Sequence, residues 1–462
     1  MVFAPADWLK SERLIPLHEN LPRVPGDNLY YAQGDALLEI ASKHRFHWSV
    51  ARPYTHHLIR TGGRDEYGNI IGDLRDSGPG NRNPLCVLRV AAVVQWTRRH
   101  DRRSASRRPL GMGTPEPAKQ SMRELTRMGG MEPVRWGVLG TSKFAREWIV
   151  PGMMKSPDVR VVAVGSRTRA KADSFARALG IPMAYGSYED LLNDPNVEAI
   201  YNPLPNHLHV PMTIVAMGAG KHVLCEKPIA LTAAEAELLR TAPKGPLVAE
   251  AFMVRHHPQW HEVRRLIREG SLGRIHTVQA FFSFYLDDPD DVRHRPEWGG
   301  GSLLDIGVYP VVASRFIFEC EPRRAIALVD LDPRFKVDRV VSGIVDFGEG
   351  RRVDFTVSTQ AVAHQRLEIF GTSGRIELPI PFNPPLGGSA RLLVDTNRAI
   401  GATAAESTET AAVDQYQLEA EAFGRAVRGL ETLSYGVEDA ISNMRVVDAL
   451  FRSSATNRWE DV

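Results

Sequence analysis

The sequence predicts an α/β protein in which a parallel-sheet domain is followed by an α+β domain with a large, mainly antiparallel open sheet. From residue 134, short apolar strands alternate with helix-length amphipathic stretches, which is typical of a parallel sheet covered on both faces. After residue 250 the strand candidates become longer and more frequent. Before residue 131 the pattern is irregular, so we expect an irregular N-terminal extension.

The strands of the first domain are predicted at 134–139, 161–165, 199–201, 223–225 and 247–249, with helices at 143–155 and 167–179. In the second domain a helix at 258–269 precedes strands at 275–285, 323–332, 337–347, 352–360 and 366–377. A helix at 302–318 interrupts these strands. The stretch 379–412 is expected to be a loop, and helices near 414–428 and 437–452 end the chain and are expected to return to the first domain.

Length and composition indicate an ordinary globular protein of more than one domain. The 462 residues are too many for one core, and 43% hydrophobic with 24% charged residues is unremarkable. A formal net charge of +2 gives no reason to expect nucleic acid or a membrane as partner. The three cysteines form neither a disulfide framework nor a metal-spaced cluster, so no metal is expected. With no secretory signal visible, a cytoplasmic location is the default expectation.

The first 130 residues divide into two segments. Residues 54–130 carry paired arginines, as at Arg98-Arg99 and Arg102-Arg103, and are interpreted as a disordered basic linker; an anion or nucleic-acid patch is the alternative. Residues 1–53, with Tyr30 and Tyr31, resemble the catalytic segment of progesterone-5β-reductase-like short-chain reductases, without that family's nucleotide-binding half. Our hypothesis is that residues 1–130 are a gene remnant joined to an enzyme that begins near Met131, with its domains at 131–252 and 253–462.

The turn after the first strand predicts a dinucleotide site. Gly140, Ser142 and Ala145 stand where such a turn needs small residues for the bend, the approach to pyrophosphate and the helix packing. A strand-to-helix turn without function is the alternative. The second strand ends at Ser166 and Arg167, where an NAD enzyme usually has Asp or Glu. With Lys171 these side chains suit a 2′-phosphate, so NADP is favoured over NAD; a capped surface helix with a solvated arginine is the alternative.

Two further motifs follow strands of the parallel sheet. Residues 203–209 include Leu204, Pro205, Asn206 and His209, and lie at the carboxyl edge of the sheet, where open α/β sheets bind ligands. The run Glu226-Lys227-Pro228 follows the next strand, and Pro228 disfavours a helical conformation for Lys227. Lys227 is therefore expected to face the crevice, although an isolated Lys-Pro is more often a solvated turn.

The order of these motifs, continued by 250–258 and 299–309, resembles the Gfo/Idh/MocA oxidoreductases over residues 133–462. Its motif sequences are similar to those of the branch that contains NADP-dependent D-xylose dehydrogenases, trans-dihydrodiol dehydrogenases and glucose-fructose oxidoreductase. This resemblance implies a Rossmann domain and hydride transfer between nicotinamide and a sugar or cyclic diol. A non-catalytic regulator that binds NADP(H) on the same fold is the alternative. A homodimer or higher homo-oligomer is also implied.

The resemblance implies roles for individual residues. Lys227 would bind the reacting oxygen, Tyr309 would be the general acid/base, and Asp305, one helical turn earlier, would orient substrate or Lys227. We expect the ammonium of Lys227 to lower the pKa of Tyr309 by favouring phenolate. His256 and His257 are candidates for the substrate side or for plain packing, and Arg293, His294 and Arg295 for contact with cofactor or sugar. The implied cofactor contacts are Gly140, Thr141, Ser142, Lys143, Phe144, Ser166, Arg167, Lys171, Leu204, Pro205, Asn206, His209, Glu226 and Lys227.

Overall fold

The structure, a computed structural model, describes residues 132–396 and 405–462 and the backbone of six short strands before residue 89. Met1–Thr114 and Pro115–Val462 form separate units. In the first unit the short strands are antiparallel and pair as β1 with β2 and as β3-β4-β5-β6: β1 Val2–Pro5, β2 Leu29–Ala32, β3 Phe46–Trp48, β4 Leu58–Arg64, β5 Ile70–Arg75 and β6 Cys86–Leu88. Most of residues 1–131, and with them the predictions for 1–53 and 54–130, lie outside the described residues.

The first domain of the second unit is built on a six-stranded parallel sheet of order β12-β11-β10-β7-β8-β9. Its strands are β7 Val134–Leu139, β8 Val159–Gly165, β9 Met183–Tyr185, β10 Ala199–Asn202, β11 His222–Glu226 and β12 Val248–Ala251. The chain winds outward from β7 to β9 and then returns to β10 on the other side of β7. This reversal leaves a crevice at the carboxyl ends of β7 and β10, the usual ligand position in such sheets.

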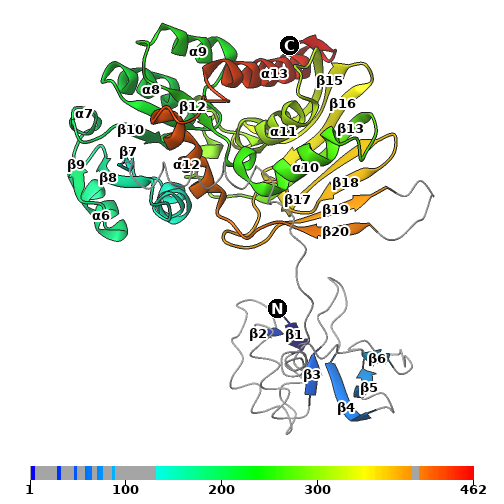
Figure 1. The fold of residues 1–462 in the computed structure, drawn as a ribbon. Coiled ribbons are helices and arrows are strands. Elements are labelled where there is room, and N and C mark those ends of the chain that lie inside the picture. Colours follow the sequence, from blue (N-terminus) through cyan, green and yellow to red (C-terminus); the bar gives the residue numbers. More distant parts are fainter. Residues whose placement is uncertain are drawn as a thin grey trace, which may run out of the picture. The chain divides into compact units, whose positions relative to one another are not determined.

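Helices connect these strands on the two faces of the sheet (Figure 1). They are α5 Val150–Met153, α6 Arg169–Leu179, α7 Tyr188–Leu192, α8 His209–Gly218 and α9 Ala233–Glu237. The helix predicted at 143–155 contains a π-helical stretch, Ala145–Ile149, before α5. The helix predicted from 167 begins later, because Thr168 is its N-cap and its hydroxyl accepts from the Lys171 N–H.

The second domain contains a nine-stranded sheet of order β20-β19-β18-β17-β13-β16-β15-β14-β21. Neighbouring strands are antiparallel except β13 and β16. The strands are β13 Ile275–Tyr285, β14 Arg324–Leu331, β15 Asp338–Gly348, β16 Arg351–Ser358, β17 Gln360–Gly371, β18 Arg375–Leu378, β19 Arg391–Asp395, β20 Glu406–Glu409 and β21 Glu460–Asp461. The Rossmann domain and the large open sheet confirm the predicted fold class.

The predictions for residues 366–377 and 379–412 of this domain were wrong. The strand expected at 366–377 is two strands, β17 and β18, joined by a tight turn in which the N–H of Gly371 donates to the carbonyl of Gly374. The stretch expected to be a loop contains β19 and β20. Every residue of β20 is exposed, so it lacks the alternation of a half-buried strand, and it is paired only through β19 at the sheet edge.

Four helices accompany this sheet: α10 Pro258–Arg268, α11 Val308–Phe318, α12 Gln415–Val427 and α13 Val437–Thr456. Helices α10, α11 and α13 lie along one face (Figure 1). The C-terminal helices lie against the Rossmann domain, since α12 contacts α5 and α13 contacts α9. Among the described residues, Pro296–Phe318 is apolar and long enough to cross a membrane, but 94% of its apolar window is buried, as in a core helix.

Candidate active site

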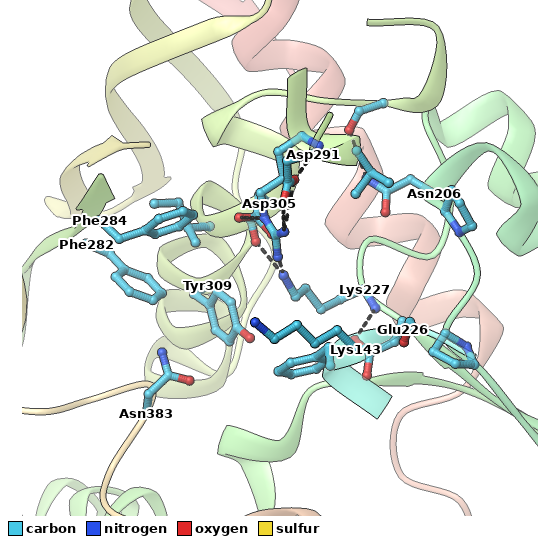
Figure 2. Close-up of a pocket in the computed structure, with 18 of the residues that line it drawn as sticks. Lys143, Asn206, Glu226, Lys227, Phe282, Phe284, Asp291, Asp305, Tyr309 and Asn383 are labelled. Atoms are coloured by element: carbon cyan, nitrogen blue, oxygen red, sulfur yellow. Dashed lines mark hydrogen bonds and ion pairs between the residues drawn. The ribbon is translucent and has the colours of Figure 1, made fainter. Parts of the chain in front are cut away.

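A cavity of about 960 Å³ lies between the carboxyl edge of the Rossmann sheet and the second domain. The turn after β7, the loop after β10 and the run after β11 line one side, and residues of β13, the segment 288–293 and α11 line the other. Several chain segments that are far apart in sequence therefore meet here. The close-up in Figure 2 shows their side chains around the common space.

The first segment is the turn after β7, which has the geometry of a phosphate-binding turn. Gly140 has φ of +85°, and a Cβ there would lie 2.9 Å from Leu204 Cδ2, so glycine serves both the bend and the close packing. The Ser142 hydroxyl accepts from the Ala145 N–H at 3.1 Å and fixes the start of the helix. Ser142, Lys143 and Phe144 line the cavity. The helix N-terminus supplies N–H groups and a positive dipole end for an anion.

The predicted 2′-phosphate residues lie beyond the central cavity. Ser166 follows β8 and is buried, with its N–H bonded to the Tyr185 carbonyl at 3.1 Å. Arg167 is exposed, as is Lys171 in the first turn of α6. Neither Arg167 nor Lys171 has a described side-chain hydrogen bond that would hold it elsewhere. Ser166 and Arg167 follow β8, which pairs with β7, and Lys171 lies one turn into α6; their role at a 2′-phosphate stays a prediction.

His209 has a supporting position. One ring nitrogen lies 2.7 Å from the Pro228 carbonyl oxygen and the other 2.6 Å from the Leu204 carbonyl oxygen. Burial, slightly opposed by these two carbonyls, lowers the pKa of His209 to about 4. A neutral imidazole has one N–H, so His209 donates to one of these two carbonyls at a time and packs between the two loops. His209 also lines the cavity, and its predicted cofactor contact stays a prediction.

Asn206 extends from the same loop to the second domain. Its side-chain amide donates to the Gly299 carbonyl at 2.9 Å. The neighbouring His207 ring stacks on Trp298 with 5.4 Å between ring centroids. These contacts join the Rossmann loop to the glycine-rich segment 299–301 and fix the distance across the cavity.

Glu226 lies at the end of β11 and is held by a buried tyrosine. The Tyr201 hydroxyl donates to Glu226 Oε1 at 2.7 Å, and the Lys227 N–H donates to Oε2 at 3.3 Å. Burial raises the pKa of Glu226 in spite of these bonds and of the nearby ammonium of Lys227. The adjoining Lys227–Pro228 peptide bond is cis.

Lys227 belongs to a three-residue ionic network that is centred on Asp305. Its Nζ donates to the backbone carbonyl of Asp305 at 2.6 Å and to Asp305 Oδ1 at 3.2 Å. The other oxygen, Oδ2, accepts from Arg293 Nε at 2.7 Å. Burial alone would raise the pKa of Asp305, but Arg293 and Lys227 outweigh it and lower the pKa to about 2. Figure 2 shows Lys227 directed at Asp305 with Tyr309 beside it.

Tyr309 departs from the sequence-based expectation. Its hydroxyl lies 3.7 Å from Met253 Sδ, and Lys227 Nζ lies 5.1 Å from the centroid of the phenol ring. Burial, with smaller contributions from Tyr416, Glu226 and Asp305, raises the pKa of Tyr309 well above its ordinary value. The expected lowering by the ammonium is therefore wrong for this arrangement. Asp305 takes the hydrogen bonds of Lys227, so the ammonium does not reach the hydroxyl.

The other histidine and arginine candidates are separated by the structure. His257 is buried and caps α10 by accepting from the Gln259 N–H at 3.1 Å, and His256 borders a different cavity. His294 stacks on Phe335 with 3.8 Å between centroids, and Arg295 is half-buried with Nη2 3.8 Å from Asp290 Oδ1. Of the five candidates, only Arg293 lines the central cavity.

Sequence reasoning missed the lining on the side of the second domain. It consists of aromatic, polar and acidic side chains, namely Phe282, Phe284, Asp288, Asp290, Asp291, Trp298, His364, Gln365, Ile380 and Asn383. The alternation of Phe282 and Phe284 along β13 was a usable signal, since residues two apart share one face of a strand. Nothing in the local sequence connects β13 with His364 and Gln365, which lie beside it through the pairing of β13 with β17, or with Ile380 and Asn383, which follow β18.

Comparison with known proteins identifies two family domains. The model for an oxidoreductase family with an NAD-binding Rossmann fold matches residues 134–248, and the Gfo/Idh/MocA C-terminal domain matches residues 260–377. An oxidoreductase of Rhizobium meliloti is 41% identical over 72% of this chain and 100% of the relative. An NADP(+)-dependent D-xylose 1-dehydrogenase of Haloferax volcanii is 36% identical over 70% of this chain and 97% of the relative.

A solved structure has the same architecture. A 3-ketoreductase of Actinomadura kijaniata, crystallised in complex with NADP and TDP-benzene, superimposes with a TM-score of 0.64 and 29% identity. The match covers 70% of this chain and 98% of the reductase. The two family domains, the full-length coverage of these relatives and the cavity between the two sheets show that the chain belongs to the Gfo/Idh/MocA family of oxidoreductases.

Proposed function

We propose that this chain is an NADP-dependent dehydrogenase or reductase that acts at a hydroxyl-bearing carbon of a sugar, such as the aldose D-xylose, or of a cyclic diol. The observation that carries the proposal is the pairing of Lys227 with Asp305 beside Tyr309, at the crevice of a dinucleotide fold. An ammonium and a phenol directed at one cavity are suited to hold and protonate a reacting oxygen.

The residues present fit NADP. The positive φ of Gly140, the helix that starts beyond Ser142 and the absence of a carboxylate at Ser166 and Arg167 leave room and charge for a pyrophosphate and a 2′-phosphate. The relatives' names support the same cofactor, since one is an NADP(+) enzyme and another was crystallised with NADP. When bound, the nicotinamide supplies or accepts the hydride.

The chain's own residues do the remaining work. Lys227, fixed by Asp305, places a positive charge where the oxygen of a carbonyl becomes negative as the carbon is reduced. Tyr309 then donates its hydroxyl proton to that oxygen, and in the oxidation direction it takes the proton back. Because burial raises its pKa, Tyr309 is a phenol at neutral pH and is ready to act as the proton donor.

A direct test is NADP reduction or NADPH oxidation, followed by absorbance with the full chain. The panel contains D-xylose and other aldoses, cyclic diols, inositols and the corresponding carbonyl compounds. We expect turnover with at least one sugar or diol, faster with NADP than with NAD, and its loss in Lys227→Met. Tight NADPH binding with no turnover across the panel would instead favour the second candidate, a non-catalytic NADP(H)-binding regulator.

We also propose a homodimer, or a higher homo-oligomer, and a cytoplasmic location. The sheet face away from α10, α11 and α13 carries register partners in four neighbouring strands, Phe281, Thr356, Ser342 and Leu328. Phe281 and Leu328 are 36% and 74% exposed, which leaves apolar surface on an open sheet face. Light scattering after gel filtration gives the mass, and we expect Leu328→Arg to shift the protein toward the monomer.

A further inference from the structure

The substrate side of the active-site cavity has an acidic segment at its mouth. Four carboxylates follow β13 at residues 287–291, and Asp288, Asp290 and Asp291 line the cavity. The segment is folded on itself, since Asp288 Oδ1 accepts from the Asp290 N–H at 3.0 Å and the Asp288 carbonyl lies 2.6 Å from His294 Nδ1. The Asp290 side chain is 92% exposed at the entrance, and its Oδ1 lies 3.8 Å from Arg295 Nη2.

Two of the three cations that line this cavity have carboxylate partners. Among the described lining residues, the lysines and arginines are Lys143, Lys227 and Arg293. Lys227 and Arg293 bind the two oxygens of Asp305, and Arg293 NH1 also lies 3.3 Å from Asp291 Oδ1. Lys143 stands on the cofactor turn. The described lining of the second domain thus offers no unpaired arginine or lysine, which a phosphate group normally requires.

The rest of this side is suited to an uncharged ring. Phe282 and Phe284 of β13 present aromatic surface, and Asn383 belongs to the lining on the same side of the cavity (Figure 2). The centroid of the Phe282 ring lies 5.7 Å from that of Tyr309 and 5.1 Å from that of Phe382, so packing against these rings fixes the position of Phe282. Aromatic faces with a few polar groups are typical of sites for small neutral ligands.

We infer that the substrate is an unphosphorylated, uncharged sugar or diol, and that the acidic segment 288–291 excludes sugar phosphates and nucleotide-diphosphate sugars. This inference rests on the proposed function and narrows it. A phosphate entering past Asp288 and Asp290 meets like charge, and inside the cavity it finds Arg293 held by two carboxylates. The relatives named above include both a free-sugar enzyme and a reductase crystallised with a nucleotide-diphosphate compound, so the family fold leaves this choice to local residues.

The experiment compares each aldose with its own phosphate ester. The full chain is assayed with D-glucose against D-glucose 6-phosphate, and with D-ribose against D-ribose 5-phosphate. We expect kcat/KM for the ester to be at least about tenfold lower, with the difference shrinking as salt rises from about 0.02 to 0.5 M, because added ions screen the repulsion. In Asp288→Asn/Asp290→Asn the ratio of kcat/KM for the free sugar to kcat/KM for its ester is expected to fall by about threefold to tenfold.

Asp287→Asn is the matched control, since Asp287 belongs to the same segment but does not line the cavity. Asp287→Asn should change the ratio of kcat/KM for the free sugar to kcat/KM for its ester by less than the double variant does. Equal use of ester and free sugar by the unaltered chain would overturn the inference and leave the proposed hydride transfer standing. A ratio that neither salt nor the double variant changes would overturn the role of the segment. No turnover of any sugar or diol would overturn both proposals. If the double variant does not fold, the salt dependence of the unaltered chain still decides.

Discussion

Lys227 Nζ is bonded more closely to the backbone carbonyl of Asp305, at 2.6 Å, than to its carboxylate, at 3.2 Å. The lysine and the aspartate are 12% and 13% exposed, so this pair is largely shielded from solvent. One of the two hydrogen bonds that hold the Lys227 ammonium therefore does not depend on the side chain of residue 305. The π-helical stretch Leu303–Gly307 leads into α11 and places this carbonyl beside the cavity.

The first prediction follows from the two hydrogen bonds of Lys227 Nζ, one to the backbone and one to the side chain of Asp305. Lys227→Met should lower kcat by about 10²–10⁴-fold, the range of a lost proton-transfer or charge-stabilising group. Asp305→Asn should cost only about tenfold, because the carbonyl bond to Nζ remains. Steady-state kcat with the best substrate and a thermal melt of each variant provide the measurement. Equal losses in the two variants would show that the carboxylate itself takes part in the chemistry.

The second prediction concerns Tyr309 and pH. Since burial holds the pKa of Tyr309 well above its ordinary value of 10, the phenol stays protonated through the neutral range. Sugar oxidation needs the deprotonated form, so its kcat/KM should rise steadily from pH 7 to 10 without a plateau, whereas carbonyl reduction should stay flat there. Tyr309→Phe should remove about 10²-fold or more of the activity and abolish the rise. A plateau near pH 7 would mean that the phenol pKa is lowered, as the sequence alone suggested.

The third prediction tests the cofactor preference. Arg167→Ala removes an exposed guanidinium at the outer end of the crevice, and we expect the Kd for NADPH to rise about 10–100-fold with NADH binding changed less than threefold. Arg169→Ala is the control, since Arg169 Nε is bonded to Asp173 at 2.9 Å. Quenching of protein fluorescence measures both affinities. Similar losses for NADPH and NADH would remove Arg167 from the 2′-phosphate site.

The fourth prediction is a dependence of stability on pH. Burial raises the pKa of Glu250 from 4.5 to about 7, although Asn443 Nδ2 and the Ile229 N–H donate to its two oxygens. A raised folded-state pKa gives stability that is fully present below pH 4.5 and is lost as pH rises through about 7. This loss amounts to at most about 3 kcal/mol. In Glu250→Gln the fall between pH 4.5 and 7 should be absent from the free energy of unfolding, whereas Glu269→Gln on the exposed end of α10 should retain it.

The fifth prediction concerns the glycine segment. A Cβ on Gly300 would collide with the backbone carbonyl of Arg293, so Gly300→Ala should displace Arg293 from Asp305. We expect kcat to fall about tenfold while the protein remains folded. Gly218→Ala is the control, because a Cβ at that position in α8 meets nothing within 4 Å. Unchanged kcat in Gly300→Ala would show that the network tolerates the shift.

Much of the fold could be predicted because its signals are local. The strands β7 and β8 and the helix α6 follow from apolar runs, the Thr168 cap and the glycine at the helix end, where Gly180 has φ of +68°. The edge strands β19 and β20 could not be predicted, since their backbone groups are satisfied by partners distant in sequence. The split of 366–377 into β17 and β18 is different, because these strands pair locally across the turn from Gly371 to Gly374, a glycine signal that sequence reasoning missed.

The sequence by itself determined the fold class and the family. It also determined which residues stand at the ends of the Rossmann strands, because apolar strands and glycine turns can be recognised from a few consecutive residues. Only the tertiary structure decided what those residues do to one another. In the folded chain Lys227 and Arg293 both bind Asp305. Tyr309 is buried, so the pKa of Tyr309 rises where sequence reasoning expected it to fall. Charge and burial act over a few ångströms in space, and residues 227, 293 and 309 become neighbours only when the two sheets meet.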